Sequence, residues 1–290
     1  VGNVYGKIIP IPFNLNTLNL VYGEEKGNIL KEKLEDAYGV GSRISILDLR
    51  KSKDPDIKAI ADYVYENIFL KYTMKQWGQT PEEIAPSVSG RVPVLISYDN
   101  RYFQDKYQGM PLDGYTKLFE NLLNHENITI KLNTKITCIE DMKEAKNIIY
   151  TGPIDELFGC KYGRLPYRSL NFVFEKESYQ SHGVVNYTVS EDYTRITEFK
   201  KLTGQKDDST TIVKEYPIPY TGGEGEIPYY SIMNEENLAL YEKYKELLKD
   251  RNIHLLGRLA EYKYYNMDGI TLKALELADE LVKQEVGINL

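Results

Sequence analysis

The feature that most constrains the fold is a long stretch of alternating residues between positions 165 and 216. Apolar residues occupy every second position in several short runs, of which Leu170, Phe172 and Phe174 form one, and polar or glycine-containing breaks separate the runs. Strands that alternate in this way bury one face and leave the other in water, which is typical of antiparallel sheets. The sequence therefore predicts an antiparallel sheet of about six strands in this region.

The first ninety residues carry a different pattern. Residues 4–13 predict a hairpin that runs into a proline-rich bend, and Asn16 and Thr17 are candidates to cap the helix that follows. Between 56 and 72 the apolar positions have helical spacing, at residues 57, 60, 61, 64, 68 and 69. Pro81 and Pro86 then break the chain into a loop that ends near Pro93. We interpret this loop as a candidate lid over a binding site.

The remaining segments predict parallel strands with helices. A short apolar strand at 147–150 ends in Thr151-Gly-Pro-Ile-Asp155, and a strand–turn–helix step of this kind is common where an α/β sheet meets a ligand. Asn234 is a candidate cap for a helix. A second apolar run at 253–256 precedes a segment with helical spacing at residues 270, 274, 277, 278 and 281.

Composition excludes several classes of protein. The 290-residue chain has a formal charge of −7, which argues against broad nucleic-acid binding, so an anionic ligand needs a local cluster of arginines. There is no apolar run of membrane-spanning length and no signal peptide pattern, and Cys138 and Cys160 fit reduced thiols, so we expect a cytoplasmic protein. The three histidines, His125, His182 and His254, lack the spacing of metal ligands, and no metal site is predicted.

Several arginines and aromatic residues stand in unusual places. Arg195 lies in the middle of a predicted strand and needs a partner there, either a carboxylate such as Glu198 or Glu215 or an anionic ligand. From their positions alone, Tyr72 and Trp77 are interpreted as core aromatics rather than as site residues. Simple packing also explains Tyr102 and Tyr230, and Arg91 alone reads as a solvated charge.

The segment from Gly257 to Asp268 is more specific. It brings Arg258, two tyrosines and the start of a helix close together in the sequence. Because a helix N-terminus attracts negative charge, this combination predicts a place for a polar, negatively charged group.

Taken in order, these segments resemble the UDP-galactopyranose mutase family across essentially the whole chain. The matching runs are Ile11–Thr17, Tyr72–Gly78, Arg91–Pro93, Tyr98–Phe103, Lys106–Pro111, Gly114–Leu118, Ile149–Asp155, Tyr167–Leu170, Tyr193–Ile196, Lys214–Pro217, Pro228–Tyr230 and Gly257–Met267.

The resemblance implies an enzyme that interconverts UDP-galactopyranose and UDP-galactofuranose for cell-wall polysaccharide synthesis. The cofactor it implies is reduced FAD, whose N5 attacks the anomeric carbon while UDP leaves, so that a flavin–sugar adduct carries the reaction. In that scheme the protein supplies position and charge. The oligomeric state is left open, with a homodimer as one option.

The resemblance also implies roles for individual residues. Arg91 and Arg195 grip the diphosphate from two sides of one cleft, with Arg91 on the lid. Tyr102, Tyr230 and Tyr264 donate hydroxyls to the phosphates. The uracil and sugar side is lined by Tyr72, Thr73 and Trp77, and Asn186 and Glu215 are further pocket residues. Arg258, Asn266 and Met267 bind the flavin, Met267 through the start of its helix.

Three departures from the family accompany the resemblance. The family begins with a strand, glycine-rich turn and helix that bind the FAD pyrophosphate, and this sequence shows no such segment. Asn266 stands where the family usually has aspartate, and Leu95 where it often has arginine. The alternative expectation is therefore a truncated module that binds UDP or a nucleotide sugar without flavin and without activity.

The predicted fold is α/β with discontinuous domains. A helical substrate domain, an antiparallel sheet and a partial Rossmann-like FAD-binding layer make up the chain. The expected segments are the hairpin at 1–15, the helical and lid domain at 16–93, a connection at 94–110, the Rossmann-like layer at 111–160, the sheet at 161–233, and the C-terminal strand and helices of the layer at 234–290.

Overall fold

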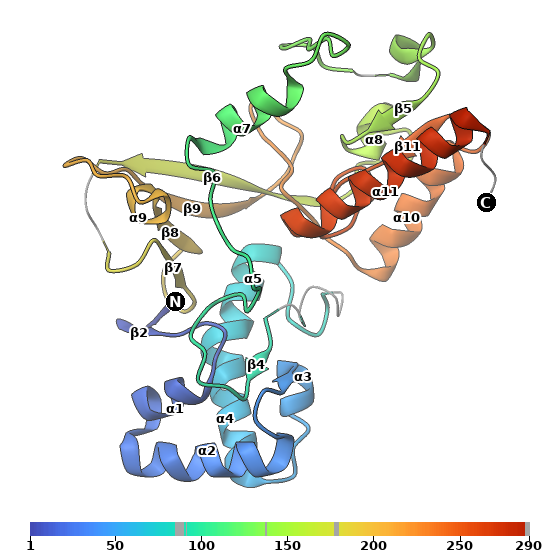
Figure 1. The fold of residues 1–290 in the computed structure, drawn as a ribbon. Coiled ribbons are helices and arrows are strands. Elements are labelled where there is room, and N and C mark those ends of the chain that lie inside the picture. Colours follow the sequence, from blue (N-terminus) through green and yellow to red (C-terminus); the bar gives the residue numbers. More distant parts are fainter. Residues whose placement is uncertain (85–89, 91, 137, 177–179, 288–290) are drawn as a thin grey trace. The chain divides into compact units, whose positions relative to one another are not determined.

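The computed structural model describes all residues except 85–89, 91, 137, 177–179 and 288–290. The chain, whose elements are labelled in Figure 1, divides into two compact units. Unit 1 comprises Val1–Lys131 and Leu170–Ile218, and unit 2 comprises Leu132–Ser169 and Pro219–Leu290. The domain boundaries expected from the sequence stay predictions.

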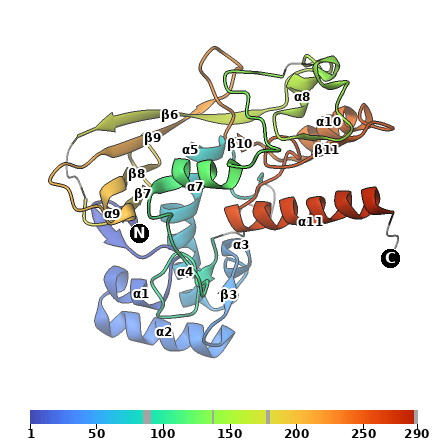
Figure 2. The same ribbon diagram turned by 45° about the horizontal axis from the view of Figure 1, so that its top comes forward.

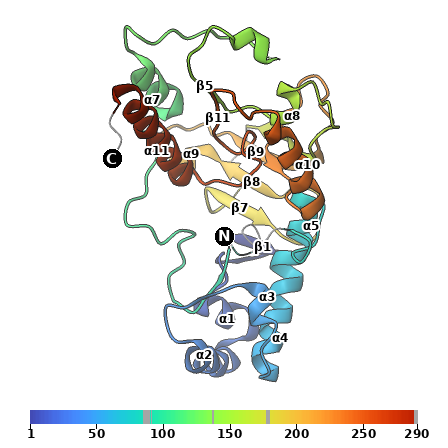
Figure 3. The ribbon, with the colours of Figure 1, turned by 90° about the vertical axis from the view of Figure 1, so that its right-hand side faces the viewer.

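The main sheet contains seven strands within the described residues, in the order β10-β6-β9-β8-β7-β1-β2. Their bounds are β1 Gly2–Val4, β2 Lys7–Ile9, β6 Tyr167–Glu175, β7 Val184–Tyr187, β8 Arg195–Glu198, β9 Ile212–Pro219 and β10 Tyr230–Ser231. Figure 3 shows β7, β8 and β9 side by side. The pairs β7–β8 and β8–β9 are antiparallel, as predicted for residues 165–216. The prediction of a purely antiparallel sheet was wrong at one place, because β1 pairs with β7 in parallel.

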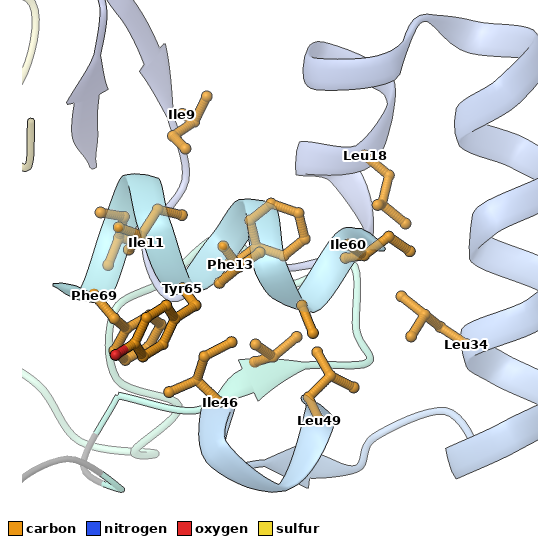
Figure 4. Packing of buried hydrophobic residues seen from close by; sticks show 14 of the residues in the cluster. Ile9, Ile11, Phe13, Leu18, Leu34, Ile46, Leu49, Ile60, Tyr65 and Phe69 are labelled. Carbon is orange, nitrogen blue, oxygen red and sulfur yellow. The ribbon is translucent and has the colours of Figure 1, made fainter. Parts of the chain in front are cut away.

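Helices and short strands build the rest of unit 1. They are α1 Leu15–Tyr22, α2 Glu24–Tyr38, β3 Arg43–Ile44, α3 Ile46–Leu49, α4 Pro55–Val64, a π-helical segment at Tyr65–Leu70, α5 Lys71–Trp77, β4 Val94–Leu95, α7 Gly114–Leu123 and α9 Phe199–Thr203. The apolar stripe predicted over 56–72 faces a core that contains Ile57, Ile60, Val64 and Phe69. Figure 4 shows this core, which also receives Phe13 from the segment after β2.

The cap of α1 differs from the prediction. Asn14, not Asn16 or Thr17, is the N-cap, and its side chain accepts hydrogen bonds from the backbone N–H groups of Asn16 and Thr17. Thr17 completes a reciprocal capping box, since its hydroxyl accepts a hydrogen bond from the Asn14 N–H. Helix α1 therefore begins one residue before the predicted caps.

Besides β10 and the first residues of β6, unit 2 contains a pair of parallel strands and several helices. The elements are a 3₁₀ turn at Ile139–Met142, β5 Ile148–Tyr150, α8 Ile154–Leu157, α10 Glu235–Glu246, β11 Ile253–Leu255 and α11 Met267–Val286. Strands β5 and β11 pair in parallel, with Ile149 opposite His254. The predicted cap at Asn234 is confirmed, because its side chain accepts a hydrogen bond from the Asn237 N–H.

The C-terminal helix α11 is long and exposed. Figure 2 shows it as a single rod at the red end of the chain. Its apolar side chains Leu272, Leu275 and Val282 are each more than half exposed. Among the residues that the structure describes, no helix has both the length and the hydropathy to cross a membrane.

Candidate functional site

Three polar residues form a row across the sheet of unit 1. Asn186 on β7 lies opposite Arg195 on β8, and Arg195 lies opposite Glu215 on β9. Directly paired residues of neighbouring strands point to the same face of a sheet. The other face carries apolar residues, among them Val185 and Ile196, which are buried. The alternation that predicted the sheet thus also sets this polar row on one side of it.

Helix α5 adds a tyrosine to the row. The Arg195 guanidinium donates a hydrogen bond to the Tyr72 hydroxyl at 3.1 Å, and that hydroxyl lies 3.4 Å from Asn186 Oδ1, to which it donates. The Asn186 amide in turn donates to the carbonyl of Val1 at 3.3 Å. The polar groups of Arg195, Tyr72 and Asn186 are therefore each fixed by a hydrogen bond to a residue from another part of the chain.

The two charged side chains of the row, Arg195 and Glu215, differ in their exposure to solvent. Arg195 Nε lies 3.5 Å from Glu215 Oε2, and the Arg195 side chain is 29% exposed while that of Glu215 is 12% exposed. Burial raises the pKa of Glu215, and the Arg195 guanidinium opposes that rise. Of the carboxylates considered from the sequence, Glu215 is thus the one beside Arg195, whereas Glu198 pairs with Lys201. The Arg195 side chain stays partly exposed and can also contact an anion.

A hollow lies beside this row within unit 1. Its cavity volume is about 90 Å³, which is below the usual range for small-molecule sites, and about 660 Å³ of space lies between its atoms when space open to solvent is included. Its lining is mostly apolar and aromatic. The lining residues are Ile11, Ile68, Phe69, Tyr72, Thr73, Trp77, Ile84, Val92, Tyr102, Asn186 and Thr188. The structure therefore brings five of the candidate residues from the sequence, those at 72, 73, 77, 102 and 186, to one cavity.

Trp77 has a double character in this hollow. It is 8% exposed, as a core aromatic would be, and it also lines the cavity. The two interpretations that the sequence left open for Trp77 are therefore compatible. A large aromatic ring with a single N–H at a cavity wall suits a planar ligand.

Lys75 is a residue of this region that sequence reasoning missed. Its ammonium group donates to the carbonyl oxygens of Tyr187, Glu191 and Tyr193, at 2.6, 2.9 and 3.2 Å. A lysine on a short helix normally reads as a solvated charge. The only signal in the sequence was its place in the same turn of helix as Tyr72.

A second group of candidate residues lies in unit 2. The Arg258 guanidinium stacks over the Tyr264 ring at 4.3 Å from the ring centroid and lies 5.8 Å from that of Tyr230. Arg258 Nε donates to the carbonyl of Tyr265 at 2.8 Å, which fixes the side chain. The group is built by a tight turn, since Gly257 has a φ of +103°, which favours glycine.

Helix α11 begins next to this group. Asn266 is its N-cap residue with extended backbone, and the Asn266 side chain makes no capping hydrogen bond. The N–H groups of a first helical turn point along the axis toward whatever precedes the helix. Met267 opens the helix and is 63% exposed. The region therefore presents helix N–H groups and a fixed arginine within one unit.

A family model described as UDP-galactopyranose mutase matches residues 67–264, more than half of the chain. This chain belongs to the UDP-galactopyranose mutase family. The family consists of isomerases.

Individual relatives agree with this assignment to the mutase family. The chain is 36% identical to a probable UDP-galactopyranose mutase of Klebsiella pneumoniae over 97% of its own length and 73% of that protein. It is 34% identical to a dTDP-fucopyranose mutase of Escherichia coli, over 97% of this chain and 76% of that one. A crystal structure of reduced UDP-galactopyranose mutase has a TM-score of 0.61 and 14% identity to this chain, with 97% and 77% of the two chains covered, which shows a shared fold.

One candidate of the mutase site falls outside the structure. Arg91 lies outside the described residues, as do residues 85–89 of the segment interpreted as a lid. The expectation that Arg91 and Arg195 grip one diphosphate therefore stays a prediction. The roles assigned to the other site residues of this mutase-family chain are likewise predictions.

We expect Tyr72→Phe to weaken UDP binding by up to about tenfold. The substitution keeps the ring in the hollow and removes the hydroxyl that contacts Arg195 and Asn186. A hydrogen bond of this kind contributes about 0.5–1.5 kcal/mol. Titration of the variant with UDP measures the change, and Tyr107→Phe is the matched control because the Tyr107 side chain is exposed. Equal affinity in the two variants would contradict a role for the Tyr72 hydroxyl.

Proposed function

We propose that this chain interconverts UDP-galactopyranose and UDP-galactofuranose. The observation that carries the proposal is the position of Arg195, whose partly exposed side chain is fixed between Tyr72 and Glu215 next to an aromatic-lined hollow. Membership of the mutase family supports the reaction class.

In this proposal the residues of unit 1 bind the nucleotide. Arg195 contacts the diphosphate, since a guanidinium fork matches two phosphate oxygens and stabilises the negative charge that UDP carries when it departs. The faces of Tyr72 and Trp77 hold uracil and the sugar side by stacking. The apolar walls from Ile68 and Phe69 exclude water, which strengthens each of these contacts.

We further propose that reduced FAD is the cofactor and that unit 2 contributes to its binding. The donors described for Arg258 and the start of α11 fit an electron-rich ring edge, because a fixed cation and helix N–H groups both stabilise negative charge. When bound, reduced FAD would supply the nucleophile that the chain itself lacks among its proposed site residues. Arg258, Asn266 and Met267 orient that ring and hold its charge.

The test uses the sole tryptophan of the chain. Because Trp77 lines the hollow, UDP is expected to change its fluorescence, and UDP at about a hundred times its dissociation constant should stabilise the fold by about 2.7 kcal/mol. A preparation with visible flavin absorbance that bleaches with dithionite, and that makes the furanose when reduced, supports the enzyme. The proposal is wrong if saturating UDP changes neither the fluorescence nor the melting temperature.

A second function is favoured by one observation. The hollow and the row that includes Arg195 both lie entirely in unit 1, so nucleotide binding there has no need of flavin contacts. A module that binds UDP or a nucleotide sugar without turnover is therefore the alternative. Colourless protein that binds UDP and makes no product supports it. Parallel titrations with UDP and dTDP compare the affinities for nucleotides with uracil and with thymine. Both are tested because one relative is named a UDP-galactopyranose mutase and another, of similar identity, a dTDP-fucopyranose mutase.

A further inference from the structure

Lys75 links helix α5 to both ends of the β7–β8 connection. Of the three carbonyls that it contacts, that of Tyr187 is at the end of β7, and those of Glu191 and Tyr193 lie on the way to β8. A lysine ammonium has three N–H donors, and these three acceptors use all of them. The contact therefore fixes the helix, the end of one strand and the start of the next at a single point.

We propose that Lys75 is a positioning residue that sets the distance between the Tyr72 hydroxyl and its partners Arg195 and Asn186. Tyr72 and Lys75 are three residues apart on α5 and so lie on the same side of the helix. Asn186 is one residue before the end of β7 and Arg195 is the first residue of β8, so both lie close along the chain to the connection that Lys75 holds. Loss of the lysine contact frees α5 to shift against the strands, and the polar row then loses its geometry. The effect on nucleotide affinity rests on the proposed function, whereas the effect on the helix does not.

The charge of Lys75 makes this link sensitive to pH. Burial lowers its pKa to about 8, against the attraction of the Glu191 and Asp192 carboxylates and with the repulsion of Lys71 on the same helix. Below that pH the ammonium satisfies all three carbonyls. Above it the neutral amine has two donors for three acceptors, so one contact is lost.

A rise in pH changes the contribution of Lys75 to folding stability in the opposite direction to its effect on the link. The pKa is lower in the folded chain than its ordinary value of 10.5. Between these values the unfolded chain binds more protons at Lys75, so the contribution of this group to stability rises with pH. A fall in UDP affinity over the same range therefore does not come from unfolding caused by Lys75.

The experiment compares the wild type with Lys75→Met and Lys75→Arg. Methionine keeps much of the length but has no donor, whereas arginine stays charged at all accessible pH values. Trp77, two residues away on the same helix, reports the position of α5 through its emission and its quenching by acrylamide without ligand. UDP titrations then report the site.

We expect Lys75→Met to expose Trp77 and to weaken UDP binding by about tenfold or more, with no pH dependence between about pH 7 and 9.5. Lys75→Arg should restore most of the affinity and hold it constant over this range, while wild-type affinity falls as pH passes about 8. A folded Lys75→Met variant with wild-type quenching would overturn the inference. A wild type that shows the Trp77 changes but binds no UDP would instead refute the proposed function.

Asp192→Asn provides a test that leaves Lys75 in place. Asp192 is exposed and acts on Lys75 through its charge, which raises the lysine pKa. Its removal should move the midpoint of the Trp77 quenching profile to lower pH. This measurement decides the question if the Lys75 variants fail to fold, since an unchanged midpoint or a flat wild-type profile would contradict the proposal.

Discussion

Replacement of Arg195 by alanine is expected to reduce the affinity for UDP by at least about thirtyfold. Truncation of one partner in a desolvated charged contact costs roughly 2–5 kcal/mol, and each 1.4 kcal/mol is a factor of ten. The loss should lie at the upper end, because the substitution leaves the Glu215 carboxylate facing the bound diphosphate. Titration by Trp77 fluorescence measures the change.

Two matched variants control this prediction. Arg43→Ala removes an exposed arginine of the same unit, whose guanidinium contacts Gln104, and should leave UDP affinity unchanged. Arg195→Lys keeps the charge without the planar fork and should give an intermediate affinity. Near-normal UDP binding by Arg195→Ala would remove the basis of the proposed function.

A double variant separates binding from stability. Arg195→Ala leaves the largely buried Glu215 without its cation, which should raise the pKa of Glu215 further and lower the melting temperature. Adding Glu215→Gln removes the charge and should restore much of the stability without restoring UDP binding. If the double variant binds UDP normally, the defect of Arg195→Ala arose from Glu215 and not from a lost phosphate contact.

The sequence contained the polar row in outline. Alternation predicts which residues of a strand share a face, so an arginine at position 195 had to have a partner on that face. Alternation along β8 already excludes Glu198, which is three residues from Arg195 and so points to the other face. The position of Glu215 opposite Arg195 is a property of the β8–β9 register and cannot be read from either strand alone. The sequence therefore limits the possible partners of Arg195 to a few residues, and the strand pairing in the structure shows which of them it is.

Other features depend on contacts between distant segments. Strand β1 has three residues and pairs with β7, more than 180 positions away, through the register Gly2 to Asn186. A run so short carries no periodic signal. The burial of Lys75 is similar, because its three acceptors are backbone carbonyls, which every sequence supplies. Neither the β1–β7 pairing nor the burial of Lys75 depends on a residue type from which the sequence could predict it.

For the C-terminal helix, the sequence predicts the element but not the surface against which it packs. Its apolar spacing correctly predicts a helix at 267–286, since such a stripe is stable in that form. The same spacing does not say which surface covers the stripe. In the described part of the chain Ile270, Leu277 and Leu281 of this stripe are half-buried, while Leu272, Leu275 and Val282, which lie outside it, are exposed. The amphipathic pattern therefore predicts helix α11 and does not predict how that helix packs.

Phe13→Ala should have the largest effect on stability. The Phe13 side chain is 1% exposed and lies among the labelled core residues in Figure 4. Loss of a buried phenylalanine ring costs about 3–5 kcal/mol, because the cavity collapses only in part. Since domains are typically stable by about 5–15 kcal/mol, the variant should lose roughly a fifth or more of that stability. Equilibrium unfolding in urea measures the loss.

The same substitution should also weaken UDP binding, although Phe13 does not line the hollow. The chain around it connects the core to the site, since Ile11 lines the hollow and the Asn14 side chain donates to Asp99 O and Asn100 Oδ1, just before Tyr102. Leu20→Ala is the control, because Leu20 lies on α1 with its side chain 52% exposed and should change stability by less than about 0.5 kcal/mol. A Phe13→Ala variant that loses under about 1 kcal/mol would show that the core around α4 repacks freely, and the hollow built on that core would then lack the rigid wall that tight nucleotide binding requires.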